Sequence, residues 1–173
     1  MKKILIMLIV VLSPVWLLAQ NSQLSKFFDK YSGQEGYTSV YITKYMFELF
    51  AKISDEKEDK EFKELTSNLN SIKILTADSL MEARNGGKFQ KELLQILPKT
   101  NYKDLMIIKE GRQDIRFLIR EENSKISELV MIITGEDDPV LIFLEGDINL
   151  KNISKMSKSM KIKGFEHLEK VDD

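Results

Sequence analysis

Residues 102–145 read YKDLMIIKEGRQDIRFLIREENSKISELVMIITGEDDPVLIFLE, and this stretch decides the fold. It contains four runs rich in aliphatic, β-branched and aromatic residues, and polar turns separate the runs at intervals of about a dozen residues. Such a series predicts a meander of four antiparallel strands joined by hairpin turns. We expect these strands at 102–109, 113–120, 126–134 and 140–145.

The side-chain pattern within the four runs indicates how the strands are covered. The second run alternates, which predicts two distinct faces. The expected faces are Ile115, Phe117 and Ile119 on one side and Arg116, Leu118 and Arg120 on the other. The other runs contain consecutive apolar residues, at 105–108, 129–133 and 140–144. This pattern predicts central strands that are at least partly covered on both faces.

Ahead of the meander, helical and strand patterns alternate. Two further strands are expected at 36–43 and 71–76, which are rich in β-branched and aromatic residues. Apolar residues at helical spacing predict four helices: one before the first of these strands, one between the two strands, and two after the second strand. The expected apolar positions are Leu24, Phe27, Phe28 and Tyr31 in the first helix, Met46, Leu49, Phe50 and Ile53 in the second, Leu80, Met81 and Ala83 in the third, and Phe89, Leu93, Leu94 and Leu97 in the fourth.

Breaks between these elements follow from local chemistry. Gly86 and Gly87 should separate the third helix from the fourth, because each glycine costs about 1 kcal/mol in a helix interior. A glycine pair can also cradle a phosphate, but neither a Lys-Ser/Thr pair nor a third glycine follows, which argues against that role. The mixed charges at 55–64 are typical of a solvated loop leading into a helix face.

The chain after the meander completes the predicted architecture. Residues 147–149 are expected to cap a final helix that carries Leu150, Ile153 and Met156, and residues 164–173 are expected to form a polar C-terminal tail. The predicted fold class is α+β. We expect a single domain over residues 21–163, in which helices pack on a mixed or antiparallel sheet of about six strands that ends in the four-stranded meander.

The N-terminus carries the pattern of a secretory signal peptide. Residues 1–20 read MKKILIMLIVVLSPVWLLAQ, with a basic start, an apolar run and a small residue, Ala19, near the expected cleavage point. A membrane anchor is the alternative, but the apolar stretch contains Pro14 and is shorter than the roughly 20 residues that span a bilayer. Because the chain has no cysteine, a thioether lipid anchor is excluded.

Composition restricts the possible functions further. Loss of Lys2 and Lys3 with the signal peptide would change the formal net charge from −1 to −3, and a mildly acidic protein is a poor nucleic-acid binder. Zero cysteines exclude disulfides, thiolate metal sites and cysteine nucleophiles, and the single histidine, His167, lies in the polar tail. We therefore expect no cofactor, no metal site and no nucleic-acid partner.

Four segments resemble a known family. They are 39–47 (SVYITKYMF), 102–106 (YKDLM), 127–131 (SELVM) and 144–150 (LEGDINL). With the signal peptide, they resemble the bacterial exported family known as domain of unknown function 4252, over roughly residues 24–156. The resemblance implies an exported α+β domain in the cell envelope, or periplasm, of a Gram-negative bacterium. It implies no catalytic residues.

Two groups of charged residues are candidates for chemistry. Glu136, Asp137 and Asp138 lie in a predicted turn, with Glu145 and Asp147 after the next strand. Oxygen-rich loops can bind calcium, but the alternating spacing of a calcium loop is missing, so turn solvation is the favoured interpretation. Arg116 and Arg120 share a strand face and could clamp a carboxylate or phosphate, although an exposed or helix-facing rim is the more common role of such a pair. The methionines Met46, Met81, Met106, Met131, Met156 and Met160 fall on expected core stripes.

The segment 150–161 is basic and amphipathic. Its lysines and its apolar residues each recur at helical spacing, so the segment predicts either a helix packed on the sheet or a contact with an anionic membrane or acidic partner. The candidate contact residues are Lys151, Ile153, Lys155, Met156, Lys158 and Met160.

These observations favour one class of function. We expect an exported, non-catalytic cell-envelope protein that binds an envelope protein or another ligand. The first alternative is a membrane-surface or lipid-associated accessory protein that acts through segment 150–161. A weaker alternative is a hydrolase that uses only carboxylates.

Overall fold

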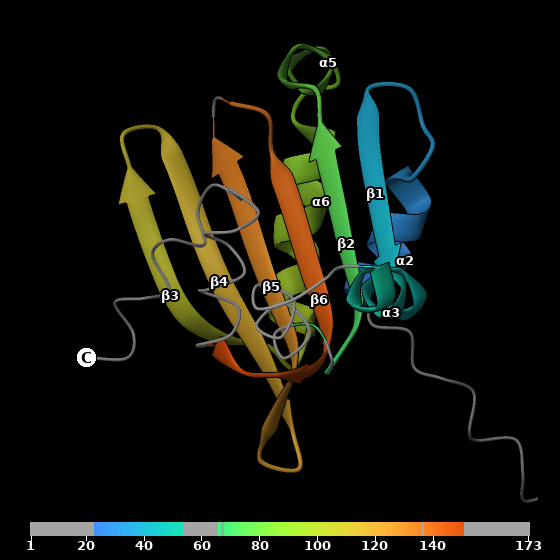
Figure 1. Cartoon of the computed structure of the whole chain (residues 1–173). Helices are drawn as coiled ribbons and strands as arrows, with labels where there is room; N and C mark the ends of the chain where they lie inside the picture. The colour runs from blue at the N-terminus through green and yellow to red at the C-terminus, as the bar shows by residue number, and fades with distance from the viewer. Residues whose placement is uncertain (1–22, 54–65, 67, 136, 151–173) are drawn as a thin grey trace, which may run out of the picture.

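The computed structural model describes residues 23–53, 66, 68–135 and 137–150. The described part is an α+β fold with four α-helices and six strands (Figure 1). In chain order the elements are α2 (Gln23–Tyr31), β1 (Tyr37–Thr43), α3 (Lys44–Ile53), β2 (Leu69–Ala77), α5 (Ser79–Arg84), α6 (Lys88–Ile96), the short 3-10 helix η1 (Leu97–Lys99), β3 (Lys103–Glu110), β4 (Gln113–Glu122), β5 (Lys125–Gly135) and β6 (Val140–Ile148).

The six strands form one antiparallel sheet in the order β1-β2-β6-β5-β4-β3. The predicted meander is confirmed as β3 to β6, and short turns join its strands. Between β4 and β5, Asn123 and Ser124 both have positive φ angles, 52° and 62°, as a two-residue turn that matches strand twist requires. The long-range pairing of β2 with β6 joins β1 and β2 to the meander, so β1 and β3 become the two edges.

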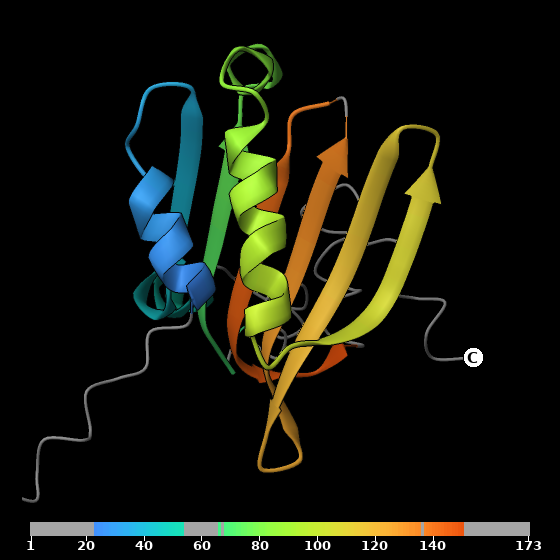
Figure 2. The same ribbon diagram turned by 180° about the vertical axis from the view of Figure 1, so that it is seen from behind.

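Both faces of the sheet carry a core. Helices α2 and α6 lie across one face (Figure 2), and that core includes Phe89 from α6 and Phe143 from β6. The core of the opposite face includes Phe47 from α3 and Phe117 from β4. The consecutive apolar residues of β5 and β6 are buried on both faces, as their pattern predicted, but the same pattern at 105–108 lies in edge strand β3, where Ile107 is 50% exposed. Among the described helices, none has the length and apolar character needed to span a bilayer.

The alternation predicted for β4 is confirmed. Ile115, Phe117 and Ile119 pack in one core, and Leu118 packs in the other. The break at Gly86 and Gly87 is also confirmed, since α5 ends before these residues and α6 begins after them.

Two expectations about the ends and faces of elements need correction. The predicted cap at 147–149 begins too early, because Asp147 and Ile148 belong to β6, where Ile148 pairs with Ile126 of β5 and is buried. Asn149 follows the strand and Leu150 is helical, and the rest of the predicted helix lies outside the described residues. The helical stripe of α3 does not face the core: Met46, Leu49 and Phe50 are all exposed.

The reason is the position of α3, which lies at the end of edge strand β1 instead of across the sheet (Figure 1). Among the side chains of α3 that the structure describes, only Phe47, with 5% of its surface exposed, reaches the core. Leu80 and Leu94, two expected core positions of the later helices, are also exposed.

Candidate functional site

The residues predicted to contact a membrane or partner, Lys151, Ile153, Lys155, Met156, Lys158 and Met160, lie outside the described residues, as do residues 1–20 and the polar tail with His167. The contact through segment 150–161 and the signal peptide therefore stay predictions. The described residues that can form a site are charged, polar and exposed apolar side chains elsewhere in the fold.

The structure disperses the predicted carboxylate cluster. Glu136 is not described. The Asp138 carboxylate accepts a hydrogen bond from the Ser79 amide at 2.7 Å, and Asp147 forms an ion pair with Lys125. Within the described part of the chain, no three histidines, cysteines or acidic residues lie close enough to hold one metal ion.

The two arginines share a strand face but do not form a clamp for a ligand. Arg116 contacts Asp104 at 2.6 Å, and Arg120 forms ion pairs with Glu122 and Glu128. Both guanidinium groups are therefore paired with carboxylates of the same chain.

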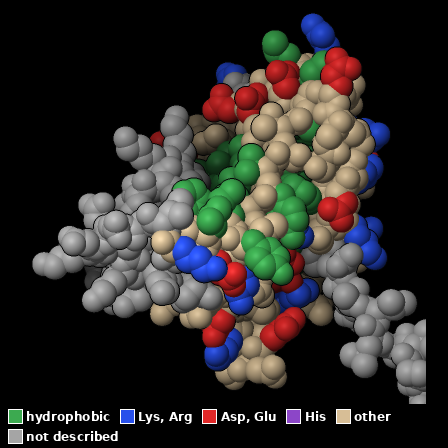
Figure 3. Space-filling view, turned by 45° about the vertical axis from the view of Figure 1, so that its right-hand side comes forward, with side chains coloured by type: hydrophobic (Ala, Val, Ile, Leu, Met, Phe, Trp, Pro, Cys, Tyr) green, Lys and Arg blue, Asp and Glu red, His purple; other side chains and the backbone are tan. Residues whose placement is uncertain are grey.

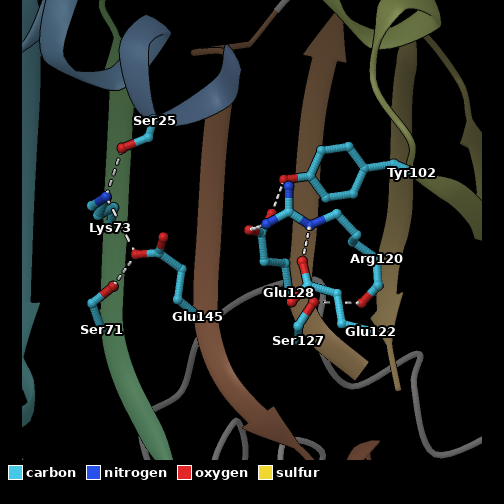
Figure 4. A network of polar contacts seen from close by, with 9 residues as sticks. All are labelled: Ser25, Ser71, Lys73, Tyr102, Arg120, Glu122, Ser127, Glu128 and Glu145. Atoms are coloured by element: carbon cyan, nitrogen blue, oxygen red, sulfur yellow. Dashed lines mark hydrogen bonds and ion pairs between the residues drawn. The ribbon is translucent and has the colours of Figure 1, made fainter. Parts of the chain in front are cut away.

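A polar network crosses the helix-covered face of the sheet (Figure 4), and Lys73 of β2 is the centre of its first half. Only 8% of Lys73 is exposed. Its ammonium group donates to the Ser25 hydroxyl at 2.9 Å and lies 3.3 Å from the Glu145 carboxylate, which also accepts from the Ser71 hydroxyl at 2.5 Å. The ammonium group also lies over the ring of Tyr41, 5.4 Å from its centroid. These contacts offset the desolvation of a buried charge and tie α2 to strands β2 and β6.

Glu128 of β5 is the centre of the second half. It is 4% exposed and accepts from the Tyr102 hydroxyl and the Arg120 guanidinium group (Figure 4). In the sheet register, Glu128 lies directly opposite Glu145, so two carboxylates from adjacent strands meet between Lys73 and Arg120. Burial raises the pKa of Glu128 above its ordinary value. The Tyr102 hydrogen bond and the Arg120 charge oppose this rise, and the charge of Glu145 adds to it.

Sequence reasoning missed Lys73, Glu128 and Tyr102 as members of one network. The sequence pattern that could have indicated them is a single charged residue next to the apolar residues of a strand. Lys73 lies between Ile72 and Ile74, and Glu128 precedes the run Leu129 to Ile133. A charge in a strand covered on both faces requires a partner, but only the strand order shows which partner it has.

The raised pKa of Glu128 predicts how the free energy of unfolding depends on pH, and this dependence tests the network. The raised pKa means that the folded chain binds this proton more tightly than the unfolded chain does, so the contribution of Glu128 to stability falls as pH rises from the ordinary pKa of a glutamate toward the raised pKa of the folded state. Glu128→Gln cannot ionise. The free energy of unfolding of the wild type relative to this variant should therefore be higher at about pH 4.5 than at neutral pH.

Urea unfolding at the two pH values measures this difference. Glu110→Gln is the matched control, because Glu110 is exposed at the end of β3 and is not a member of the network, so the pH dependence should stay as in the wild type. A wild type that gains stability relative to Glu128→Gln as pH rises would contradict the assignment.

A cavity of about 250 Å³ lies at the opposite end of the sheet, between α5, α6 and the end of β5. Glu82 and Asp137 are among its lining residues. The Glu82 carboxylate accepts from the amides of Phe89 and Gln90, at 3.2 and 2.9 Å, and so occupies the N-terminus of α6. This position next to Gly87 is where a phosphate would bind, so the chain fills its own anion site.

The described surface also carries an apolar area that no sequence pattern had marked as exposed. We call it the edge patch, and it consists of Val40, Tyr41, Tyr45, Met46, Leu49 and Phe50, from β1 and α3. Val40 and Tyr41 point to opposite faces of the sheet, with Tyr41 on the face of α2, so the patch extends around the β1 edge. Figure 3 turns the β1 side of the molecule forward and shows hydrophobic side chains gathered there. Tyr45 is 81% exposed, and Leu49 is 52% exposed.

The edge patch contrasts with the polar network. The ionic groups of the network contact one another within the fold, whereas the edge patch presents large apolar side chains to solvent. Exposed apolar areas of this kind mark interaction surfaces in soluble proteins. The edge patch is therefore the candidate functional site.

Comparison with known proteins identifies a family for the chain. A family model described as "Domain of unknown function (DUF4252)" matches residues 31–156. No curated protein and no solved structure matches the chain. The matched range extends from the end of α2 past the end of β6 and includes the edge patch.

Proposed function

The chain belongs to the DUF4252 family, and on that premise we propose that it is an exported cell-envelope protein that acts as a non-catalytic interaction module, binding a protein partner through the edge patch. The observation that carries the proposal is the exposure of six large apolar side chains on adjacent elements, β1 and α3. The pattern of residues 1–20 supports export.

The chemistry of the edge patch favours a protein partner. Aromatic residues and methionine are enriched at the centres of protein interfaces, and the patch contains three aromatic residues and one methionine. Charged side chains of α3 stand next to patch residues in the sequence, since Lys44 precedes Tyr45 and Glu48 precedes Leu49, and the two charged groups lie 4.0 Å apart. An apolar centre with a charged rim is the usual arrangement of a protein-binding surface.

The experiment is crosslinking in intact cells from a photoreactive amino acid placed at Tyr45. We expect a specific crosslinked product, and Met46→Asp in the same protein should reduce it at least about tenfold, because a buried charge at the centre of an interface costs more than 1.4 kcal/mol. The mass of the uncrosslinked protein from the periplasmic fraction reports in the same sample whether residues 1–20 have been removed.

A photoreactive residue at Leu80 is the matched control, since Leu80 is 70% exposed but lies on α5, away from the edge patch. Equal crosslinking from Leu80 and Tyr45, or a product that Met46→Asp leaves unchanged, would contradict binding through the edge patch. Protein that keeps residues 1–20 and stays in the cytoplasm would contradict export.

A further inference from the structure

We propose that the edge patch binds a second copy of the chain, and that the two β1 strands pair in antiparallel fashion about a two-fold axis at Val40. This inference rests on the proposed function, because it names the partner of the same surface. The two sheets would then continue into one another across the dimer.

The two edges of the sheet differ in how they resist strand pairing. Edge strand β3 has the sequence KDLMIIKE, with four charged residues, and a register shift interrupts its pairing between Asp104 and Met106. Charges and bulges of this kind protect an edge. Edge strand β1 has the sequence YTSVYIT, without charge or proline, and its pairing with β2 is regular along its whole length. The unprotected edge is therefore β1.

The backbone of β1 shows which groups are available on this edge. The Gly36 carbonyl accepts a hydrogen bond from the Asp78 amide of the neighbouring chain segment at 2.9 Å, so the backbone groups of Gly36 point toward β2. Because successive residues of a strand point their amide and carbonyl groups to opposite sides, those of Ser39 and Tyr41 point outward. These outward groups are what a further strand would bind.

The outward groups also restrict the register between two copies. In an antiparallel pair, residues with outward groups must lie opposite each other. An axis at Val40 satisfies this rule, because Ser39 of each copy then lies opposite Tyr41 of the other. The same axis is the one that overlaps the two strands fully, since Val40 is the middle residue of Tyr37–Thr43. The Tyr37 amide already donates to the Gln34 carbonyl at 3.2 Å, so the pairing depends on the outward groups nearer the axis, those of Ser39 and Tyr41.

Charge complementarity at the strand ends favours this arrangement. Glu35 precedes β1, and Lys44 follows it as the first residue of α3. Antiparallel pairing brings the beginning of one β1 next to the end of the other, so Glu35 of each copy lies near Lys44 of its partner. No like charges meet along the strands, because β1 has none.

Burial of the two Val40 side chains at the axis would further stabilise the pairing of the two strands. Val40 is 42% exposed, and in this register it lies opposite its own copy in a non-hydrogen-bonded pair, the type with the closer side chains. Pairs of β-branched residues stabilise adjacent strands. Since α3 begins directly after β1, its exposed Tyr45 lies at the same edge and can extend the contact.

Sedimentation velocity of the purified protein, over a roughly hundredfold range of concentration, measures the monomer–dimer equilibrium. We expect a dimer whose dissociation constant rises at least about tenfold in Val40→Lys, because two like charges then lie opposite each other. Val40→Thr, which keeps the β-branch without charge, should leave the dimer intact. Ile107→Lys on β3 is the control at the other edge, since Ile107 is 50% exposed.

A mixture of two variants tests the register itself. Val40→Lys and Val40→Glu should each be monomeric alone, and an equal mixture should form a mixed dimer because opposite charges then meet at the axis. Recovery of the dimer in the mixture also shows that neither substitution has unfolded the chain.

The outcomes distinguish this inference from the proposed function. A dimer that Val40→Lys dissociates and the mixture restores supports both. A chain that is monomeric at all concentrations, or a dimer that Val40→Lys does not change, overturns self-pairing. If the crosslink from Tyr45 then joins the chain to another protein, the proposed function stands alone, and if no specific crosslink forms, both proposals fail.

Discussion

Replacing Gly146 by alanine should destabilise the protein by about 4 kcal/mol or more, which is a large share of the roughly 5–15 kcal/mol that stabilises an ordinary domain. Gly146 lies in β6 opposite Leu69 of β2, and its φ angle is +147°. A Cβ atom at this position would lie 2.2 Å from the Asn68 carbonyl oxygen and 2.8 Å from the Leu69 Cα. Both contacts are with backbone, so β2 and β6 would have to separate.

Urea unfolding of the two proteins measures this effect, and Gly111→Ala is the matched control. Gly111 also has a positive φ angle, +61°, but no atom lies within 4 Å of its expected Cβ. This variant should lose only the roughly 1 kcal/mol of left-handed backbone strain. Similar losses in the two variants would show that the close contact between β2 and β6 does not determine the cost.

Replacing Phe89 by alanine should lower the free energy of unfolding by about 4 kcal/mol. Phe89 is fully buried on α6, and its ring centroid lies 5.0 Å from that of Phe27, 5.3 Å from Tyr31 and 5.8 Å from Tyr37. The cluster joins α6 to α2 and to edge strand β1. The loss combines the transfer of a buried aromatic ring with the cavity that it leaves.

Leu94→Ala on the same helix is the control, because Leu94 is 44% exposed and its truncation should change stability by about 0.5 kcal/mol or less. Thermal or urea unfolding separates the two cases. Equal effects at Phe89 and Leu94 would mean that the aromatic cluster does not hold α6 to the sheet.

Polar contacts also connect α2 to α6. The Tyr31 hydroxyl donates to the Glu92 carboxylate at 2.8 Å, and Lys30 pairs with Glu92 at 2.5 Å. The hydrogen bond from Lys30 is the main cause of the lowered pKa of Glu92, and burial raises the pKa of Tyr31. Lys30 and Glu92 are partly solvated, so we expect them to orient α2 and to add little stability.

Much of the fold could be predicted because its signals are local. Hairpin turns, the alternation of β4 and the glycine pair between α5 and α6 act over a few residues, and each was read correctly. The cap predicted at 147–149 begins too early for a local reason as well, since Asp and Asn are both common helix caps. Pairing of Ile148 with Ile126 extends the strand past Asp147, and Leu150 is the first helical residue after it.

The candidate site was less predictable. The apolar stripe of α3 correctly indicates a helix, but periodicity cannot show whether a stripe faces a core or solvent. Exposure of Met46, Leu49 and Phe50 depends on where α3 lies. That position depends on β1 being the last strand of the sheet, which no pattern within α3 encodes.

The amino-acid sequence by itself determined the α+β class, the meander and most element positions, because turn chemistry and side-chain periodicity act between residues close in the chain. Only the tertiary structure decided which strands are edges, which charges pair, and which apolar residues stay exposed. The pairing of β2 with β6 makes β1 an edge, and the register places Glu128 opposite Glu145. These outcomes depend on contacts between distant segments, whose free energy is decided by the packing of the whole sheet.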